Sequence, residues 1–152
     1  VENADDTIFH GANFIVAPTE KNTEAGIEWC RGLGKILGCR KISVLTPEEH
    51  DEMIGFVSQL THVIAVSLMT CNDNTHLVDY TGDSFRDLTR IASINENMWS
   101  ELFLMNKKYL LQHMDAFIAE LNEFRGLLAE DDKEGLKEKM RLSTERHAFF
   151  IQ

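Results

Sequence analysis

The order of apolar and polar positions near the start of the chain predicts two short strands joined by a helix. Residues 13–17 form a short apolar run typical of a buried strand, and residues 41–45 alternate well enough for a second one. A helix capped by Asn22 or Thr23 lies between them, and Gly38 closes it in a left-handed conformation. Strand, helix and strand at this spacing predict a βαβ unit with parallel strands. Two strands are too few for a sheet domain, so we expect this unit to be the tail of a larger one.

The strongest helix start in the sequence follows directly. Thr46 can act as N-cap, Pro47 suits the first helical position, and Glu49 completes a capping box. The helix should run to about Cys71. Its second half, around residues 63–66, is apolar on every side, which predicts burial all round, as in the centre of a helical bundle or a dimer.

The rest of the chain predicts turns and further helices. Turn-forming and polar residues fill positions 74–84, and a short helix follows at 85–91. A long helix should span 95–129, with a charged break before a last helix at about 133–147 and an apolar end at 149–151. The predicted fold is therefore mainly α, with one short βαβ unit. The long helix carries one apolar stripe: Trp99, Phe103, Leu110, Phe117, Leu121, Phe124 and Leu128.

Composition and charge narrow the function classes. With 43% hydrophobic and 26% charged residues the chain is typical of a globular protein. Its formal net charge of −10 argues against nucleic-acid binding, which needs a basic surface. No apolar run approaches the ~20 residues of a membrane span, and the first residues lack a secretory leader, so we expect neither membrane nor export.

Three cysteines, an odd number without disulfide or zinc spacing, indicate reduced thiols and a cytoplasmic protein. A metal site built from Cys71, Asp73 and His76 is conceivable, but this stretch is more typical of a polar loop, and we expect no metal. No G-x-G-x-x-G turn follows a strand, so a pyrophosphate-binding loop is missing from the sequence.

Two groups of polar residues could carry chemistry. Ser58 and His62 share a predicted helix face with Asp51 and Gly55, and could either line a cleft or form a satisfied contact at a packing seam. Arginine donates two parallel hydrogen bonds to a carboxylate, which makes Arg86 and Arg90, four positions apart and on one side of a predicted helix, candidates for binding an anion.

Asp87 precedes Arg90 by three positions and can pair with it, so the alternative is an ordinary solvated helix face. Trp99 is either the first core residue of the long helix or the wall of a site, and the two roles are compatible.

Two motifs resemble the signature of the prephenate dehydrogenase family. Residues 85–92, F-R-D-L-T-R-I-A, followed by M-W at 98–99, match its G-F-R-D-x-T-R-I-A and M-W elements. Residues 47–51, P-E-E-H-D, and the pair Ser58 and His62 match its helix start and its S-x-L-P-H element. The order is that of the family, and the resemblance extends over about residues 13–128.

Four positions depart from the family pattern. Thr61 stands where the family usually has proline before the histidine, which could alter the local helix geometry. Asp83-Ser84 replaces glycines of many relatives, and Glu96 replaces a proline, which puts the loop geometry in doubt.

The resemblance implies a fold and a domain division. Residues 1–46 would be the end of a Rossmann-type nucleotide-binding domain, and residues 47–152 a helical substrate-binding and dimerisation domain like the C-terminal domain of 6-phosphogluconate dehydrogenase. The family's catalytic histidine would lie upstream of Val1, so no catalytic residue is assigned in this chain. His10 lacks the P-M-A-G sequence that follows that histidine.

The resemblance also implies an activity. The family oxidatively decarboxylates prephenate to 4-hydroxyphenylpyruvate with NAD in tyrosine biosynthesis, and NADP is the alternative cofactor. Arg90 would bind a substrate carboxylate, Ser58 and His62 would contact substrate, and Asp87 and Trp99 would lie near it. We expect a homodimer formed through the helices. The alternatives are an arogenate dehydrogenase and a non-catalytic helical dimerisation module.

Overall fold

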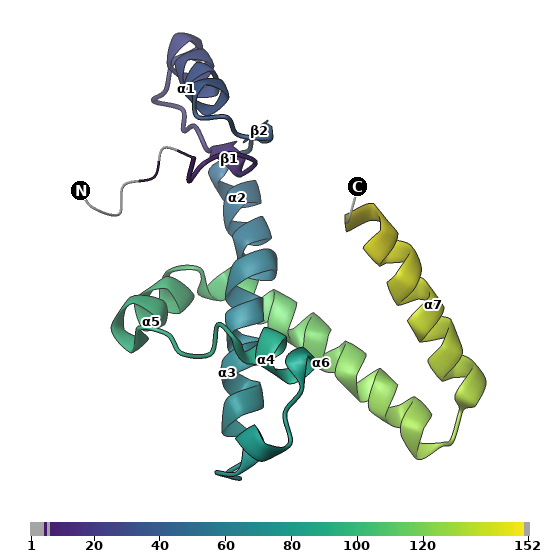
Figure 1. Cartoon of the computed structure of the whole chain (residues 1–152). Helices are drawn as coiled ribbons and strands as arrows, with labels where there is room; N and C mark the ends of the chain where they lie inside the picture. The colour runs from purple at the N-terminus through teal and green to yellow at the C-terminus, as the bar shows by residue number, and fades with distance from the viewer. Residues whose placement is uncertain (1–4, 6, 151–152) are drawn as a thin grey trace.

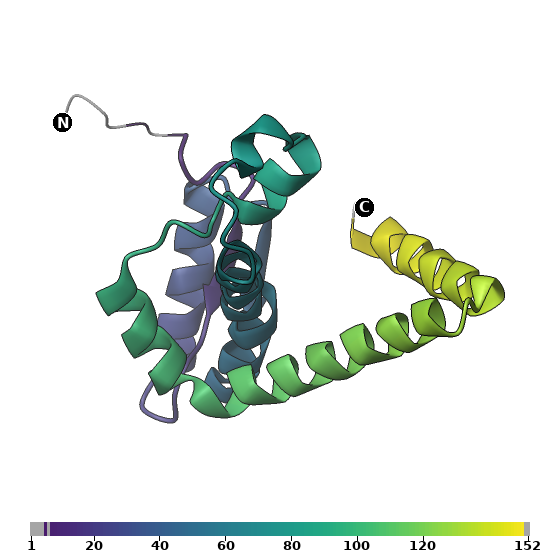
Figure 2. The ribbon, with the colours of Figure 1, turned by 90° about the horizontal axis from the view of Figure 1, so that it is seen from below.

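A small βαβ unit lies at one end of a long helix, and most of the later helices pack against the middle and the far half of that helix (Figure 1). The computed structural model describes residue 5 and residues 7–150, without the side chain of Phe150. The last two helices form an open hairpin that extends away from the rest of the molecule (Figures 1 and 2). The predicted class, mainly helical with a short parallel sheet, is confirmed.

The βαβ unit has the predicted order and direction. Its elements are β1 (Asn13–Val16), α1 (Glu24–Ile36) and β2 (Lys41–Val44). The strands are parallel, with Asn13 opposite Lys41 and Val16 opposite Val44. Thr23 caps α1 by accepting the Gly26 N–H, and Gly38 has a φ of +73° after the helix ends. A Cβ at Gly38 would collide with the His10 ring, so space as well as backbone conformation requires glycine there.

The long helix starts as predicted but is not regular. It consists of α2 (Pro47–Ile54), a π-helical segment η1 (Gly55–Leu60) and α3 (Thr61–Thr70). The Thr46 hydroxyl accepts the Glu49 N–H at 3.1 Å, and the Glu49 carboxylate accepts the Thr46 N–H at 2.7 Å. This bond from the Thr46 N–H lowers the pKa of Glu49. The prediction of one regular helix is wrong at η1, where the wider turn interrupts the three- and four-residue steps that define a common face.

The predicted long helix over 95–129 is two helices. The remaining elements are η2 (Leu77–Asp79), α4 (Asp83–Thr89), α5 (Glu96–Met105), α6 (Lys107–Ala129) and α7 (Lys133–Phe150). The break lies at Asn106, whose backbone leaves helical geometry (φ −105°, ψ 22°). Its side chain donates to the Asp51 carbonyl of α2 at 2.8 Å. This tertiary contact favours a break at Asn106, although the apolar stripe continues on both sides of it.

The core of the single chain is small. Among the described residues, the buried apolar side chains are Leu60, Ala65 and Leu110. The burial on all sides expected for residues 63–66 is not reached within this chain, where only Ala65 is buried. Many large apolar side chains are exposed, including Met105 at 85% and Phe149 at 77%. Within the apolar end predicted at 149–151, Ile151 and the side chain of Phe150 lie outside the described residues.

The continuous helix Pro47–Thr70 has 24 residues and contains an 18-residue window with a mean hydropathy of 1.5, enough by length and composition to cross a membrane. The expectation that no segment reaches this length is therefore wrong by this criterion. The central helix of a protein without a membrane meets the same criterion, and this helix carries the polar Ser58, Gln59 and His62 near its middle. These residues make contacts within the protein, described below.

Candidate functional site

Ser58 and His62 come together where η1 joins α3. The His62 Nδ1 lies 2.8 Å from the Ser58 carbonyl oxygen, and the Thr61 hydroxyl donates to the same oxygen at 2.6 Å. A carbonyl only accepts hydrogen bonds, so His62 must carry a proton on Nδ1. Nε2 then remains to accept or donate a bond from outside. Thr61, which replaces the family's proline, leaves the helix continuous (φ −62°, ψ −38°).

Trp99 of α5 covers the imidazole of His62. The two rings stack with centroids 3.7 Å apart and planes inclined by 28°. Trp99 also meets Phe103 one turn later, with centroids 5.4 Å apart. Trp99 is half-buried between these rings. It therefore begins the apolar stripe and at the same time forms a wall beside His62.

Arg90 follows the last residue of α4, a short helix that packs against α3. Both Arg90 and Asp87 are exposed. In the described part of the chain Asp87 and Arg90 form no ion pair, whereas Arg86 lies 3.7 Å from the Asp83 carboxylate. The guanidinium of Arg90 is thus not neutralised by its own helix.

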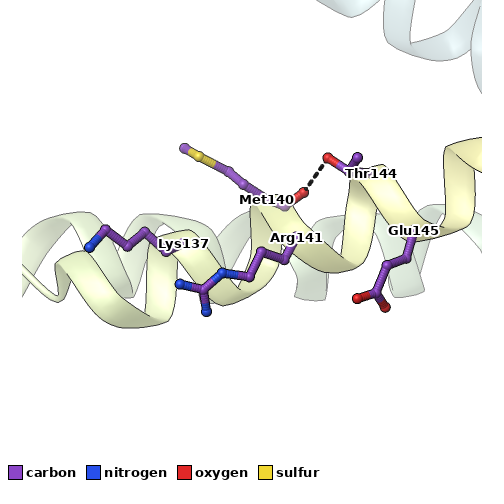
Figure 3. A pocket seen from close by; sticks show the side chains of 5 residues that line it. All are labelled: Lys137, Met140, Arg141, Thr144 and Glu145. Atoms are coloured by element: carbon purple, nitrogen blue, oxygen red, sulfur yellow. Dashed lines mark hydrogen bonds between the residues drawn. The ribbon is translucent and has the colours of Figure 1, made fainter.

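Neither of two hollows on the chain is lined by Ser58, His62 or Arg90. One, of about 410 Å³, lies between α3 and α6 and is almost wholly apolar, with Val63, Leu68 and Phe117 in its wall. The other, of about 440 Å³, is a surface hollow of α7 alone (Figure 3). It is lined by Lys137, Met140, Arg141, Thr144 and Glu145.

The structure thus brings Ser58, His62 and Trp99 together and places Arg90 and Asp87 on the neighbouring element. It also reveals three polar residues that the sequence did not single out: Gln59, Asn106 and His113. Their side chains join α2 and η1 to the start of α6. The sequence feature that could have indicated these contacts is that Asn106 and His113 are polar residues that fall on the apolar stripe of the predicted long helix.

Among the described residues, no glycine-rich turn follows either strand. Their sheet has two strands, and Arg31-Gly32-Leu33-Gly34 lies inside α1. A Cβ at Gly34 would lie 3.0 Å from side chains of Phe14 and Ile42, so this glycine serves helix–strand packing. No group of three metal-ligating side chains occurs among residues 5 and 7–150.

Solved structures share this architecture along nearly the whole chain. Prephenate dehydrogenase from A. aeolicus, in complex with hydroxyphenyl propionate and NAD+, superposes with a TM-score of 0.86 at 27% identity. The match covers 98% of this chain and 54% of that one. Arogenate dehydrogenase from Synechocystis superposes with a TM-score of 0.84 at 18% identity over 98% of this chain and 56% of that one, which shows the fold alone.

Sequence relatives agree. Prephenate dehydrogenase of Bacillus subtilis is 29% identical over 141 residues, which are 90% of this chain and 38% of the relative. Cyclohexadienyl dehydrogenase of Zymomonas mobilis is 30% identical over 142 residues, 90% of this chain and 48% of the relative. The chain thus spans less than half the length of these relatives.

The fold and these relatives define the class of protein. It is a helical domain joined to the edge of a Rossmann-type domain, the arrangement of the similar dehydrogenases named above. The family model for the dimerization domain of prephenate dehydrogenase matches residues 46–142. The chain belongs to the prephenate dehydrogenase family.

Proposed function

We propose that this chain is the substrate-binding and dimerising part of an enzyme that oxidatively decarboxylates prephenate to 4-hydroxyphenylpyruvate. The observation that carries the proposal is the assembly of Ser58, His62 and Trp99 in the middle of the matched family segment. Residues 1–46 would belong to the nucleotide-binding domain and residues 47–152 to the helical domain. The enzyme would act in tyrosine biosynthesis in the cytoplasm.

Each residue has a proposed role that its chemistry permits. Arg90 binds a substrate carboxylate through two parallel hydrogen bonds, for which its lack of an ion pair with Asp87 leaves it available. His62 forms a hydrogen bond to the substrate through Nε2, because Nδ1 is held by the Ser58 carbonyl, and the Ser58 side chain forms a further contact to the substrate. Trp99 keeps the imidazole in place and shields one of its faces, and Asp87 adds negative charge near Arg90.

NAD would take the hydride that leaves the ring carbon bearing the hydroxyl, with NADP as the alternative acceptor. The described residues do not fit a pyrophosphate, so the cofactor would be held mainly by other parts of the nucleotide-binding domain. The contribution of this chain is to orient the substrate and balance its charge. Loss of carbon dioxide makes the ring aromatic, which drives the reaction.

We further propose that two copies of the helical domain pair. The hollow between α3 and α6 is almost wholly apolar, and Ile118 and Leu121 in its wall are each about half exposed. Contiguous apolar surface of this kind is unusual on a monomer. The matched family segment is itself described as a dimerization domain. The occupant of the hollow would be a helix of the second copy.

An arogenate dehydrogenase is the second candidate, since a cyclohexadienyl dehydrogenase and an arogenate dehydrogenase are among the similar proteins. The test is formation of reduced nicotinamide by the whole protein with each substrate and each cofactor. We expect the highest kcat/KM with prephenate and NAD. A folded whole protein that turns over neither substrate would overturn the proposal and favour a non-catalytic dimerisation module.

A further inference from the structure

Three polar residues, Gln59, Asn106 and His113, form hydrogen bonds around the π-helical segment: Gln59 and Asn106 bond to each other, and His113 bonds separately to a neighbouring backbone carbonyl. Asn106 Nδ2 donates to the Asp51 carbonyl and to Gln59 Oε1, both at 2.8 Å. Gln59 Nε2 donates in turn to the Leu102 carbonyl at 3.2 Å. We call Gln59, Asn106 and His113 the η1 network. Gln59 is 5% exposed, so its amide depends on these partners.

His113 fixes the next carbonyl along the helix. Its Nε2 lies 3.0 Å from the Glu52 carbonyl oxygen, and its ring packs against Phe56 with centroids 5.3 Å apart. Two consecutive carbonyls of α2, those of Asp51 and Glu52, thus accept bonds from side chains of the α5–α6 region. A side chain that bonds to the carbonyls of a helix is a recognised cause of local departure from α-helical geometry.

Gly55 has no side chain, so the His113 ring and the Asn106 amide can come close to the helix backbone. A Cβ there would lie 3.2 Å from the His113 ring and 3.4 Å from Asn106 Nδ2, tighter than ordinary contact. The network, the glycine and the π-helical segment therefore occupy the same place in the structure.

The π-helical segment decides where His62 points. A π-helical turn holds about one residue more than an α-helical turn, and one residue corresponds to ~100° of rotation about the axis. If η1 became α-helical, everything after it would turn by about that angle relative to α2. His62 would then leave the ring of Trp99, which lies 3.7 Å away in the present geometry.

We infer that Asn106 is a positioning residue for the substrate site, which acts through η1 on His62. The inference rests on the proposed function for its kinetic consequence, but the geometry stands by itself. Asn106 is suited to the task because one amide nitrogen supplies both donors. Aspartate at this position has nearly the same shape but would place carboxylate oxygens against two acceptors, the Asp51 carbonyl and Gln59 Oε1.

The test compares Asn106→Asp with Leu110→Ala in the whole enzyme. Leu110 is buried one turn further along α6 and has no part in the network, so its variant controls for general destabilisation. We expect Asn106→Asp to lower kcat/KM for the substrate at least tenfold, with KM for NAD within about twofold. Leu110→Ala should keep kcat/KM within about twofold even where its melting temperature falls equally. Equal losses in both variants, or no loss in Asn106→Asp, would overturn the inference.

A double-mutant cycle tests the route through His62. In the background His62→Ala, the further change Asn106→Asp should lower kcat/KM by a smaller factor than in the wild type, because one of the groups being positioned is already gone. Full additivity would overturn the inference. If Asn106→Asp does not fold, His113→Phe removes the donor to Glu52 instead, and a loss of at least threefold in kcat/KM is expected. An unchanged value would overturn the inference as well.

A measurement without turnover separates this inference from the proposed function. With ¹⁵N-labelled histidine in the whole protein, the His62 signal should show a proton on Nδ1, as its bond to the Ser58 carbonyl requires. In Asn106→Asp this signal should change to that of a ring averaging between tautomers, while Leu110→Ala should retain it. An enzyme inactive on both substrates would refute the proposed function, and the NMR result would still decide the role of Asn106.

Discussion

His62 can offer a bound substrate only one ring nitrogen, because the other is engaged by the Ser58 carbonyl. The backbone thereby selects the tautomer, and the stacked Trp99 restricts rotation of the ring. A side chain held in this way loses little freedom when a ligand binds, which favours affinity. Arg90 differs, since it is exposed and has to be ordered by the substrate itself.

Arg90→Ala should chiefly weaken substrate binding. A hydrogen bond to a charged group contributes ~1.5–3 kcal/mol, so kcat/KM for prephenate should fall at least about tenfold. Arg90→Lys should restore only part of the loss, because an ammonium group cannot form the two parallel bonds. Steady-state kinetics on the whole enzyme would measure both effects, with KM for NAD unchanged.

The matched control for this change is Arg86→Ala. Arg86 lies on the same short helix and is also exposed, but its partner is Asp83. Exposed pairs of this kind contribute ~0–1 kcal/mol, so kcat/KM should hardly change. A KM for prephenate that stays the same in Arg90→Ala would remove Arg90 from the site.

The N-terminal cap of α2 should make a measurable contribution to the stability of the protein. Thr46→Ala removes the hydroxyl that accepts the Glu49 N–H, and loss of such a cap lowers the free energy of unfolding by ~1 kcal/mol. The pKa of Glu49 is lowered in the folded state by bonds from the Thr46 N–H and hydroxyl. Its contribution is therefore present above the unfolded pKa and is lost as pH falls through the folded pKa.

Urea unfolding of both proteins at about pH 7 and about pH 3 would show this, since an unfolded glutamate titrates near 4.3. We expect the difference between wild type and Thr46→Ala to be smaller at the lower pH. Thr144→Ala is the control, because the Thr144 hydroxyl only donates to the Met140 carbonyl on exposed α7 (Figure 3). A difference that does not depend on pH would mean that Glu49 does not take part in the cap.

The same elements show what the sequence could and could not predict. The capping box of Thr46 and Glu49 and the glycine after α1 were predictable because their determinants lie within four residues. The π-helical segment was not, because Asn106 and His113 bond to the Asp51 and Glu52 carbonyls just before it from 55 and 61 residues away. The apolar stripe likewise gave no sign of the break at Asn106.

In the candidate site, too, local features were partly predictable from the sequence and long-range contacts were not. The sequence predicted that the Ser58 and His62 side chains share a helix face, and the structure joins His62 instead to the backbone carbonyl of Ser58, four residues earlier. The stacking of Trp99 on His62 depends on how α5 packs against the long helix, which periodicity along one helix does not specify. Whether Arg90 joins these residues around a substrate stays a prediction.

For the whole molecule we expect a homodimer, and the purified chain should scatter light with twice its 17.4 kDa mass. The physical reason is the apolar hollow between α3 and α6, where a charge would prevent pairing. Ile118→Glu, at a hollow-lining position that is 49% exposed, should therefore shift the protein toward the single-chain mass. Ile36→Glu on distant α1, where the side chain is 83% exposed, should not.

A folded wild-type chain with a mass of 17.4 kDa at micromolar concentration would contradict the dimer. Circular dichroism would establish that the sample is folded. The expectation would also fail if Ile36→Glu dissociated the dimer as readily as Ile118→Glu, because the hollow would then have no special part in pairing.

Because the core of the single chain is small, the melting temperature of the protein should depend on its concentration. With Leu60, Ala65 and Leu110 as the buried apolar side chains among the described residues, folding and pairing should be one event governed by mass action. A hundredfold dilution then removes ~2.7 kcal/mol of stabilisation. The melting temperature should fall by several degrees on dilution, since ~1 kcal/mol shifts it by ~2–4 °C at this chain length. This protein would have no single melting temperature, only one for each concentration, and calorimetry over a dilution series would trace the curve.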